Sequence, residues 1–195
     1  MRPHKNNNGQ GTAVLTYRLK KPVTVIGMMG AGKTAVGKSL ATRLGVPFMD
    51  SDAEIETAAN MSIAEVFDRD GEAFFRDREA EVIQRLLDTG PMVLSTGGGA
   101  FLAERNRAAI SKAGVSVWLR ADLDLLWQRV RHKTTRPLLR TADPKRTLGE
   151  IYAARKDIYA LADLVVDADP SYSITAMRDH VIRVLLTRPD ILEDK

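Results

Sequence analysis

Short runs of apolar and β-branched residues alternate along the chain with longer segments of helical periodicity. The run 23–26 (Val-Thr-Val-Ile) contains only residues that suit a strand buried on both faces. Short apolar runs of this kind, bounded by turn residues, are typical of strands rather than helices. The pattern predicts five strands, at 23–26, 48–49, 92–95, 115–119 and 164–166.

Helical patterns fill most of the intervals between these runs. They predict helices at 34–44, 53–59, 62–87 and 174–186. Gly45 and Pro47 end the first of them, and Ser62 with Glu65 forms a capping box at the start of the third. Strands that alternate with helices predict βαβ units and a parallel sheet covered on both faces. We therefore expect a three-layer α/β/α fold with a five-stranded parallel sheet.

The two ends of the chain and one internal segment depart from this alternation. Residues 1–20 contain an asparagine run and no long apolar stretch, so we expect a flexible extension rather than a signal peptide or a membrane span. We expect residues 21–188 to form one domain and residues 189–195 a C-terminal tail. Segment 131–146 is rich in Arg, Lys, Thr and Pro, which indicates an excursion from the core.

Composition narrows the classes of function. The chain has 195 residues, 44% hydrophobic and 28% charged, which suits a globular domain. Its net charge of +4 fits an anionic ligand but is too small to indicate nucleic acid. With no cysteine and only three scattered histidines, disulfides, thiol nucleophiles and a histidine-rich metal centre are not expected. We expect a cytoplasmic monomer that binds neither nucleic acid nor membrane.

The first predicted strand leads directly into a phosphate-binding motif. The sequence is Gly27-Met28-Met29-Gly30-Ala31-Gly32-Lys33-Thr34, which fits G-x-x-x-x-G-K-[ST] in the required strand–loop–helix setting. The glycines let backbone N–H groups turn inward, and the next helix directs its positive end at the same anion. The ATP-binding residues expected here are Gly27, Gly30, Ala31, Gly32, Lys33, Thr34 and Ala35.

Two side chains of this loop have predictable tasks. We expect Lys33 to bridge the β- and γ-phosphates and the Thr34 hydroxyl to bind Mg²⁺. The motif leaves the second substrate open, because GTPases, ATPases and small-molecule kinases share it. No N-K-x-D signature for guanine is present, and the chain is too short for a motor or helicase.

Two aspartates follow the second predicted strand. We expect Asp50 and Asp52 to point to similar sides of an extended segment, at the strand end where open α/β sheets place ligands. We assign Asp50 to hydrated Mg²⁺ and Asp52 to the acceptor hydroxyl, which it orients or deprotonates. The structural alternative is that Asp52 only caps the following helix.

The third predicted strand ends in Ser95-Thr96-Gly97-Gly98-Gly99, without the aspartate that supports Mg²⁺ in many P-loop enzymes. Consecutive glycines leave bare backbone that a ligand can approach closely, although they also suit a tight strand-to-helix turn. Elsewhere, Arg76 and Glu79 can face each other on a helix; alone, such a pair is more often a surface salt bridge.

Taken together and in order, these motifs resemble shikimate kinase over roughly residues 22–186. The matching signatures are the P-loop, Asp50-Ser51-Asp52, Phe75-Arg76-x-x-Glu79, Ser-Thr-Gly-Gly-Gly, Arg136-Pro137-Leu138-Leu139 and the helical Arg155. Thr34 and Ser51 are mild departures, since relatives often carry serine and threonine there. The resemblance implies a nucleoside-monophosphate-kinase-like fold and the phosphorylation by ATP of the 3-hydroxyl of shikimate, a step of chorismate and aromatic amino-acid biosynthesis.

The resemblance also implies roles for residues of the acceptor pocket. Arg76 and Arg155 are expected to clamp the substrate carboxylate, because a guanidinium fork matches a carboxylate bidentately. Asp52 is expected to hold the ring hydroxyls, and Glu79 to hold Arg76 in place. The backbone of the glycine triplet completes this pocket, so that the substrate-binding residues are Asp52, Arg76, Gly97, Gly98, Gly99 and Arg155.

By the same resemblance, segment 131–146 is a mobile lid. Arg136 is its arginine that reaches the transferring phosphoryl group, where it would stabilise the spreading negative charge. Lid closure would also exclude water as a competing acceptor. Arg129 falls where the family places an arginine over adenine, although Arg131, two residues later, is a second candidate. The catalytic set is therefore Lys33, Asp52 and Arg136.

Other assignments stay open. A gluconate-type sugar-acid kinase or a nucleoside monophosphate kinase would share the P-loop and the lid. The pair Arg76 and Arg155 with the glycine triplet favours a cyclic carboxylate instead. A catalytically inactive nucleotide-binding domain is a third alternative, which the presence of Lys33, Asp52 and Arg136 disfavours.

Overall fold

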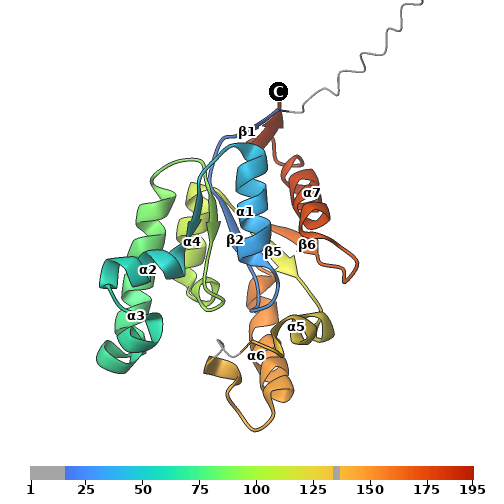
Figure 1. Cartoon of the computed structure of the whole chain (residues 1–195). Helices are drawn as coiled ribbons and strands as arrows, with labels where there is room; N and C mark the ends of the chain where they lie inside the picture. Colours follow the sequence, from blue (N-terminus) through green and yellow to red (C-terminus); the bar gives the residue numbers. More distant parts are fainter. Residues whose placement is uncertain (1–15, 134–136) are drawn as a thin grey trace, which may run out of the picture.

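A computed structural model describes residues 16–133 and 137–195 of the chain. Its centre is a five-stranded sheet in the order β3-β4-β2-β5-β6, in which every neighbouring pair is parallel (Figure 1). The strands are β2 (Val23–Ile26), β3 (Phe48–Asp50), β4 (Val93–Ser95), β5 (Val115–Arg120) and β6 (Leu164–Asp167). The five predicted strands and their parallel arrangement are thus confirmed.

The sheet forms because its central strands are apolar on both faces. All four residues of β2 and all three of β4 are buried, as are the first five of β5. The parallel register aligns Val25 with Ser95 and Asp50 with Ser95, so β2, β3 and β4 end at one edge of the sheet. The loops after these strands therefore meet at that edge, which is where α/β sheets bind ligands.

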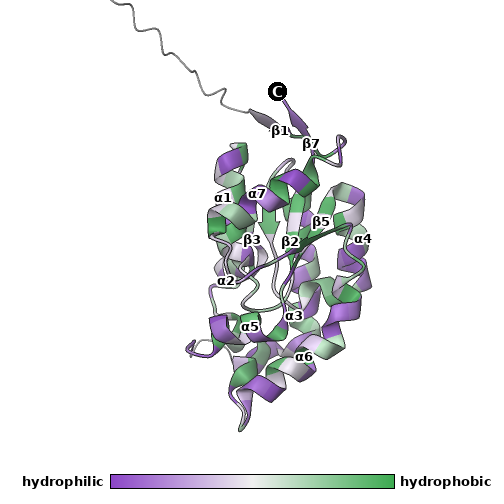
Figure 2. Cartoon of the chain, turned by 90° about the vertical axis from the view of Figure 1, so that its right-hand side faces the viewer, coloured by the Kyte–Doolittle hydropathy of each residue, from purple (hydrophilic) through white to green (hydrophobic). Residues whose placement is uncertain are grey.

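Helices cover both faces of the sheet. They are α1 (Lys33–Leu44), α2 (Ser51–Ala59), α3 (Ile63–Leu87), α4 (Glu104–Ala113), α5 (Leu123–Val130), α6 (Pro144–Tyr159) and α7 (Ile174–Leu185). Single 3₁₀ turns, η1 (Ala100–Leu102) and η2 (Pro137–Leu139), follow the glycine triplet and precede α6. Figure 2 shows α1 and α7 on one side of the strands and α4 on the other, which confirms the three layers.

A second, smaller hydrophobic cluster lies beside the main core. Ile55 of α2 packs with Val66 and Phe75 of α3, apart from the large cluster around the sheet. Within α3, Gly71 has φ +82° and ψ 171°, so two helical segments meet there at a kink. The α2–α3 unit therefore has a local core of its own, which supports the residues that α3 carries toward the site.

The ends of the chain differ from the expected extension and tail. Strand β1 (Tyr17–Leu19) pairs antiparallel with β7 (Leu192–Asp194), and the guanidinium carbon of Arg43 lies 4.8 Å from the Tyr17 ring centroid. Lys20 Nζ forms an ion pair of 2.6 Å with Glu193. Two segments expected outside the domain are thus joined to each other and to α1. Residues 1–15 lie outside the described residues.

Among the described residues, no helix has the length and apolar content needed to cross a membrane.

Candidate active site

The phosphate-binding loop has the backbone that its glycines permit. Gly27, Gly30 and Gly32 all have positive φ, at 141°, 85° and 94°. A Cβ on Gly30 would come within 2.8 Å of Val130 Cγ1, so the loop also packs directly against α5. Helix α1 begins at Lys33, immediately after the left-handed Gly32. Its positive end therefore points into the loop, as binding of a phosphate requires.

Lys33 and Thr34 connect this loop with its surroundings. Lys33 Nζ donates hydrogen bonds to the carbonyl oxygens of Gly27 at 2.8 Å and Met28 at 3.1 Å. The Thr34 hydroxyl lies 3.5 Å from Asp50 Oδ2, across the space between the end of β3 and the start of α1. The ammonium group thus lies against the carbonyl oxygens of the phosphate-binding loop.

The two carboxylate oxygens of Asp50 make different contacts. Oδ1 accepts hydrogen bonds from the backbone N–H of Asp52 at 3.1 Å and of Ala53 at 3.4 Å, which caps α2. Oδ2 is the oxygen that faces Thr34. A carboxylate and a hydroxyl suit Mg²⁺, which usually takes one or two protein oxygens and completes its shell with water and phosphate. The donor set therefore fits the expected ion.

The expected extended arrangement of Asp50 and Asp52 is wrong. Helix α2 already begins at Ser51, so Asp52 lies in its first helical turn. The alternative role of Asp52 as a cap is also wrong, because Asp50 is the capping residue. The helical backbone directs Asp52 toward the glycine triplet, where a Cβ on Gly97 would lie 2.7 Å from its Oδ1.

The surroundings of Asp52 make its carboxyl a weaker acid than usual. Burial raises its pKa from 3.8 to about 6, and the charges of Asp50 and Glu79 add to the rise. The charge of Lys33 acts in the opposite direction. A carboxylate of this pKa is ionised at neutral pH and is a better proton acceptor than an exposed aspartate.

Each glycine of the triplet contacts one charged side chain of the pocket. A Cβ on Gly97 would meet Asp52, a Cβ on Gly98 would lie 3.4 Å from Arg155 Nη1, and a Cβ on Gly99 would lie 2.7 Å from Arg76 Nη2. The bare backbone therefore accommodates close approaches from α2, α3 and α6, and at Gly97 and Gly99 a Cβ would force the neighbouring side chain to shift. The triplet does more than form a tight turn, since it brings two cations and one carboxylate to a single loop.

Arg76 is held by two carboxylates. Its Nη1 donates to Glu79 Oε2 at 2.9 Å, and its Nε and Nη2 face Glu72 Oε1 at 3.4 and 3.3 Å. Glu79 is 1% exposed, and burial raises its pKa even though Arg76 lowers it. The pair is therefore not a surface salt bridge. The outer edge of the guanidinium, between Nη1 and Nη2, faces Gly99 and keeps donors for another anion.

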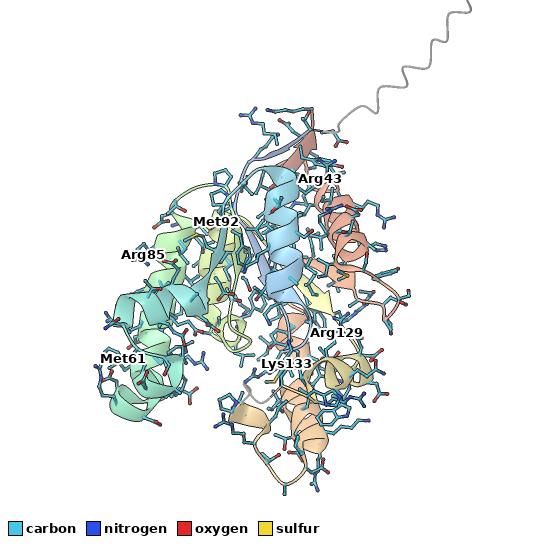
Figure 3. The ribbon with its side chains drawn as sticks, viewed as in Figure 1. Arg43, Met61, Arg85, Met92, Arg129 and Lys133 are labelled. Carbon is cyan, nitrogen blue, oxygen red and sulfur yellow. The ribbon has the colours of Figure 1, made fainter. Side chains whose placement is uncertain are left out.

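Arg129, rather than Arg131, lies at the phosphate-binding loop. Its Nη1 is 3.2 Å from the Gly30 carbonyl oxygen and 3.3 Å from that of Ala31. Figure 3 places Arg129 near the end of α1 at which the loop lies. Arg131 is exposed and lines a separate small cavity beside α5. Arg136, expected in the lid, lies outside the described residues.

One cavity of about 1160 Å³ unites these groups. It is lined by every described residue that sequence analysis assigns to the site except Gly27. The lining on the β6–α7 side was not predicted from the sequence; it comes from Asp169, Tyr172, Ser173, Ile174 and Met177. These residues carry no motif, and only the placement of α7 beside α1 brings them to the cavity.

Behind the glycine triplet lies a further residue that sequence analysis did not identify. The Tyr159 hydroxyl donates a hydrogen bond of 2.6 Å to the Gly98 carbonyl oxygen, and the residue is fully buried. It stands one helical turn after Arg155 on α6. Its signal in the sequence is that of an ordinary core aromatic residue.

A parallel sheet with a phosphate-binding loop after β2 and a charged pocket beside that loop defines a P-loop phosphotransferase that acts on a small anion. The comparisons with known proteins agree and are more specific. The model of the shikimate kinase family matches residues 29–185. The chain belongs to the shikimate kinase family.

Individual relatives show how close this relation is. The chain is 68% identical over 175 residues to a shikimate kinase of Ruegeria pomeroyi, which covers 90% of each chain. The structure of a shikimate kinase from Acinetobacter baumannii in complex with shikimate is similar with a TM-score of 0.77 and 34% identity, over 86% of this chain and 92% of that one.

A more distant structure shares the fold alone. It is a gluconokinase from Sinorhizobium meliloti, at 18% identity and a TM-score of 0.57, over 87% of this chain and 94% of that one. The gluconokinase therefore shares the architecture of this chain, and this similarity does not support the gluconate-type alternative at the level of family.

Proposed function

We propose that the chain transfers the γ-phosphoryl group of ATP to the 3-hydroxyl of shikimate. The observation that carries this proposal is the glycine triplet, whose members contact Asp52, Arg155 and Arg76 in turn. A loop that gathers two guanidinium groups and one carboxylate suits an acceptor with a carboxylate and hydroxyl groups. Membership of the shikimate kinase family supports the same substrate.

The acceptor carboxylate binds between Arg76 and Arg155 in this proposal. The free edge of the Arg76 guanidinium faces Gly99, and Arg155 Nη1 approaches Gly98 from the opposite helix. Guanidinium groups bind carboxylates through parallel N–H···O bonds, which fix orientation as well as adding energy. Glu79 and Glu72 hold the Arg76 fork in the required plane.

Asp52 then accepts a hydrogen bond from the attacking hydroxyl. Its carboxylate lies at Gly97, beside both Lys33 and the acceptor pocket. It orients the hydroxyl in line with the γ-phosphorus and takes its proton as the new P–O bond forms. The bond from the γ-phosphorus to the β–γ bridging oxygen breaks, and ADP leaves.

Charge on the transferring group is neutralised from several sides. The loop N–H groups and Lys33 bind the β- and γ-phosphates. The Thr34 hydroxyl, and Asp50 through water, would hold Mg²⁺, which would supply Lewis-acid neutralisation of the phosphate oxygens. We further propose that segment 131–146 closes as a lid and that Arg136 reaches the phosphoryl group from it. Arg129 lies where it can contact the nucleotide above the P-loop carbonyls.

The test is phosphate transfer from Mg-ATP to shikimate, gluconate and AMP, assayed side by side with ADP release and product mass as readouts. We expect transfer to shikimate alone, and none with Asp52→Asn. Transfer only to gluconate or AMP would reject the proposed acceptor. ATP binding without transfer to any acceptor would instead indicate the inactive nucleotide-binding domain.

A further inference from the structure

Tyr159 is a buried titratable residue that the mechanism above does not use. It is 0% exposed, and it does not line the main cavity. Its ring packs against Trp118 of β5, with centroids 6.0 Å apart. A hydroxyl at this depth costs free energy unless it is hydrogen-bonded, and phenylalanine would fill the same space without that cost. The hydroxyl is therefore unnecessary for packing alone.

The contacts of this hydroxyl reach both halves of the site. It donates to the Gly98 carbonyl at 2.6 Å, and it lies 3.8 Å from Met28 Sδ in the phosphate-binding loop. A Cβ on Gly98 would lie 3.6 Å from the Tyr159 hydroxyl and 3.7 Å from the Gly27 carbonyl oxygen. Tyr159 thus lies where the loop after β2 touches the loop after β4.

The hydrogen bond to Gly98 also sets the direction of the next N–H group. In a trans peptide, the carbonyl of one residue and the N–H of the next point in opposite directions. Because the Gly98 carbonyl points back to Tyr159, the Gly99 N–H points away from the core. Gly99 lines the cavity and Tyr159 does not, so this N–H is presented on the side where the acceptor binds.

The same side chain fixes the helix that carries Arg155. The two residues are four apart on α6 and therefore share one face of the helix. Full burial of Tyr159 against Trp118 leaves α6 little freedom to rotate about its axis. Arg155 is thereby directed at Gly98, where its Nη1 would lie 3.4 Å from a Cβ.

We propose that Tyr159 is a positioning residue for the acceptor, which fixes the Gly98–Gly99 peptide and Arg155 relative to each other. The inference rests on the proposed function, because it assigns Gly99 and Arg155 to the acceptor. Tyr159 touches no substrate itself. Its loss should therefore weaken binding of the acceptor much more than binding of ATP.

The test variant is Tyr159→Phe, which keeps the ring and removes only the hydroxyl. We expect the KM for shikimate to rise about fivefold to tenfold, because that factor corresponds to the loss of one buried hydrogen bond. The KM for ATP should change less than about twofold. The matched control is Tyr152→Phe, on the same helix but outside the lining of the cavity, which should leave both constants unchanged. Thermal unfolding of each variant records any loss of stability.

A double-mutant cycle with Arg155→Lys separates positioning from a general structural role. If Tyr159 acts through Arg155, the effects of the two substitutions on the KM for shikimate are less than additive. An unchanged KM for shikimate, equal rises for both substrates, or full additivity would overturn the proposal. If the wild-type chain instead phosphorylates a different acceptor, the proposed function fails. The KM values of the wild-type chain and of Tyr159→Phe for that acceptor and for ATP then decide the role of Tyr159.

Discussion

Gly97 lies so close to Asp52 that a methyl group on its Cα would come within 2.7 Å of Asp52 Oδ1 and 3.0 Å of Oδ2. Contacts under 3.0 Å essentially do not occur at real Cβ atoms, so one of the two groups would have to move. The identity of the residue at position 97 thus determines where the carboxylate stands. Gly99 stands in the same relation to Arg76, whose Nη2 would lie 2.7 Å from a Cβ at that position.

We expect Gly97→Ala mainly to lower kcat and Gly99→Ala mainly to raise the KM for shikimate. Gly97→Ala displaces Asp52 from the attacking hydroxyl and should lower kcat by about 100-fold, as misplacement of a catalytic group by about an ångström does. Gly99→Ala displaces Arg76 and should mainly raise the KM for shikimate. Steady-state kinetics check both, with Gly149→Ala in α6 as a control that leaves them unchanged. The same constant changing in both variants would contradict the assignment.

The activity should depend on the ionisation of Asp52. With a pKa of about 6 in the free protein, kcat/KM should fall tenfold per pH unit below about pH 6, because the protonated carboxyl cannot accept the hydroxyl proton. A pH–rate profile of phosphoryl transfer measures this. Asp52→Asn should abolish turnover while nucleotide affinity, measured by titration calorimetry, stays within about threefold. Turnover that survives in this variant would remove Asp52 from the mechanism.

The same residue should lower the stability of the fold at neutral pH. Its pKa is raised on folding from 3.8 to about 6, so the folded protein holds the proton more tightly than the unfolded chain does. The resulting stabilisation is complete below about pH 4 and is lost as the pH rises through about 6. At pH 7, Asp52→Asn should therefore raise the free energy of unfolding by up to about 3 kcal/mol. Urea unfolding of both proteins at pH 4 and pH 7 checks the sign: the difference should appear only at the higher pH.

Glu79→Gln should weaken the acceptor site through Arg76. The substitution keeps the shape of a side chain that is 1% exposed but removes its charge from the 2.9 Å contact with Arg76. We expect the KM for shikimate to rise about tenfold, since hydrogen bonds to charged groups contribute about 1–3 kcal/mol to holding the Arg76 fork. Glu81→Gln on the exposed face of α3 is the control, as its pair with Arg78 is solvent-exposed. Equal effects of the two variants would contradict a specific role for Glu79.

Arg129 and Arg131 should differ in their effect on ATP. Arg129→Ala removes the guanidinium from the carbonyls of Gly30 and Ala31 and should raise the KM for ATP by about tenfold. Arg131→Ala should leave it within about twofold, because that side chain lies on a different surface of α5. Nucleotide titration at constant acceptor concentration distinguishes the two. A larger rise in the KM for ATP with Arg131→Ala than with Arg129→Ala would instead assign the nucleotide contact to Arg131.

The sheet was predictable because its signals are local. Buried strands such as β2 and β5 occur in the sequence as short runs of apolar and β-branched residues, and the phosphate-binding motif after β2 requires a loop and then a helix. The pair β1 and β7 was missed because each strand has only three residues and its partner lies at the far end of the chain. No local sequence pattern predicts a pairing between strands so far apart in the sequence.

That the candidate residues line one cavity was predictable from the sequence, but their mutual contacts were not. Arg76, Arg155 and the glycine triplet were expected together, yet the one-to-one contacts of Gly97, Gly98 and Gly99 depend on how three helices pack. Asp52 was placed on an extended segment because the sequence does not reveal that Asp50 caps α2. Tyr159 was missed for a related reason: its hydrogen bond is to a backbone carbonyl 61 residues away, and no residue type marks such a partner.

The antiparallel pair of β1 and β7 has a consequence for how the chain is made. Tyr17–Leu19 is synthesised well before its partner Leu192–Asp194, which comes much later in the sequence. Domains begin to fold while synthesis proceeds, and contacts between distant segments form late because closing a long loop costs entropy. The nascent chain can therefore assemble its phosphate-binding loop and central strands first. The strand Tyr17–Leu19 stays without its partner until Leu192–Asp194 has been synthesised.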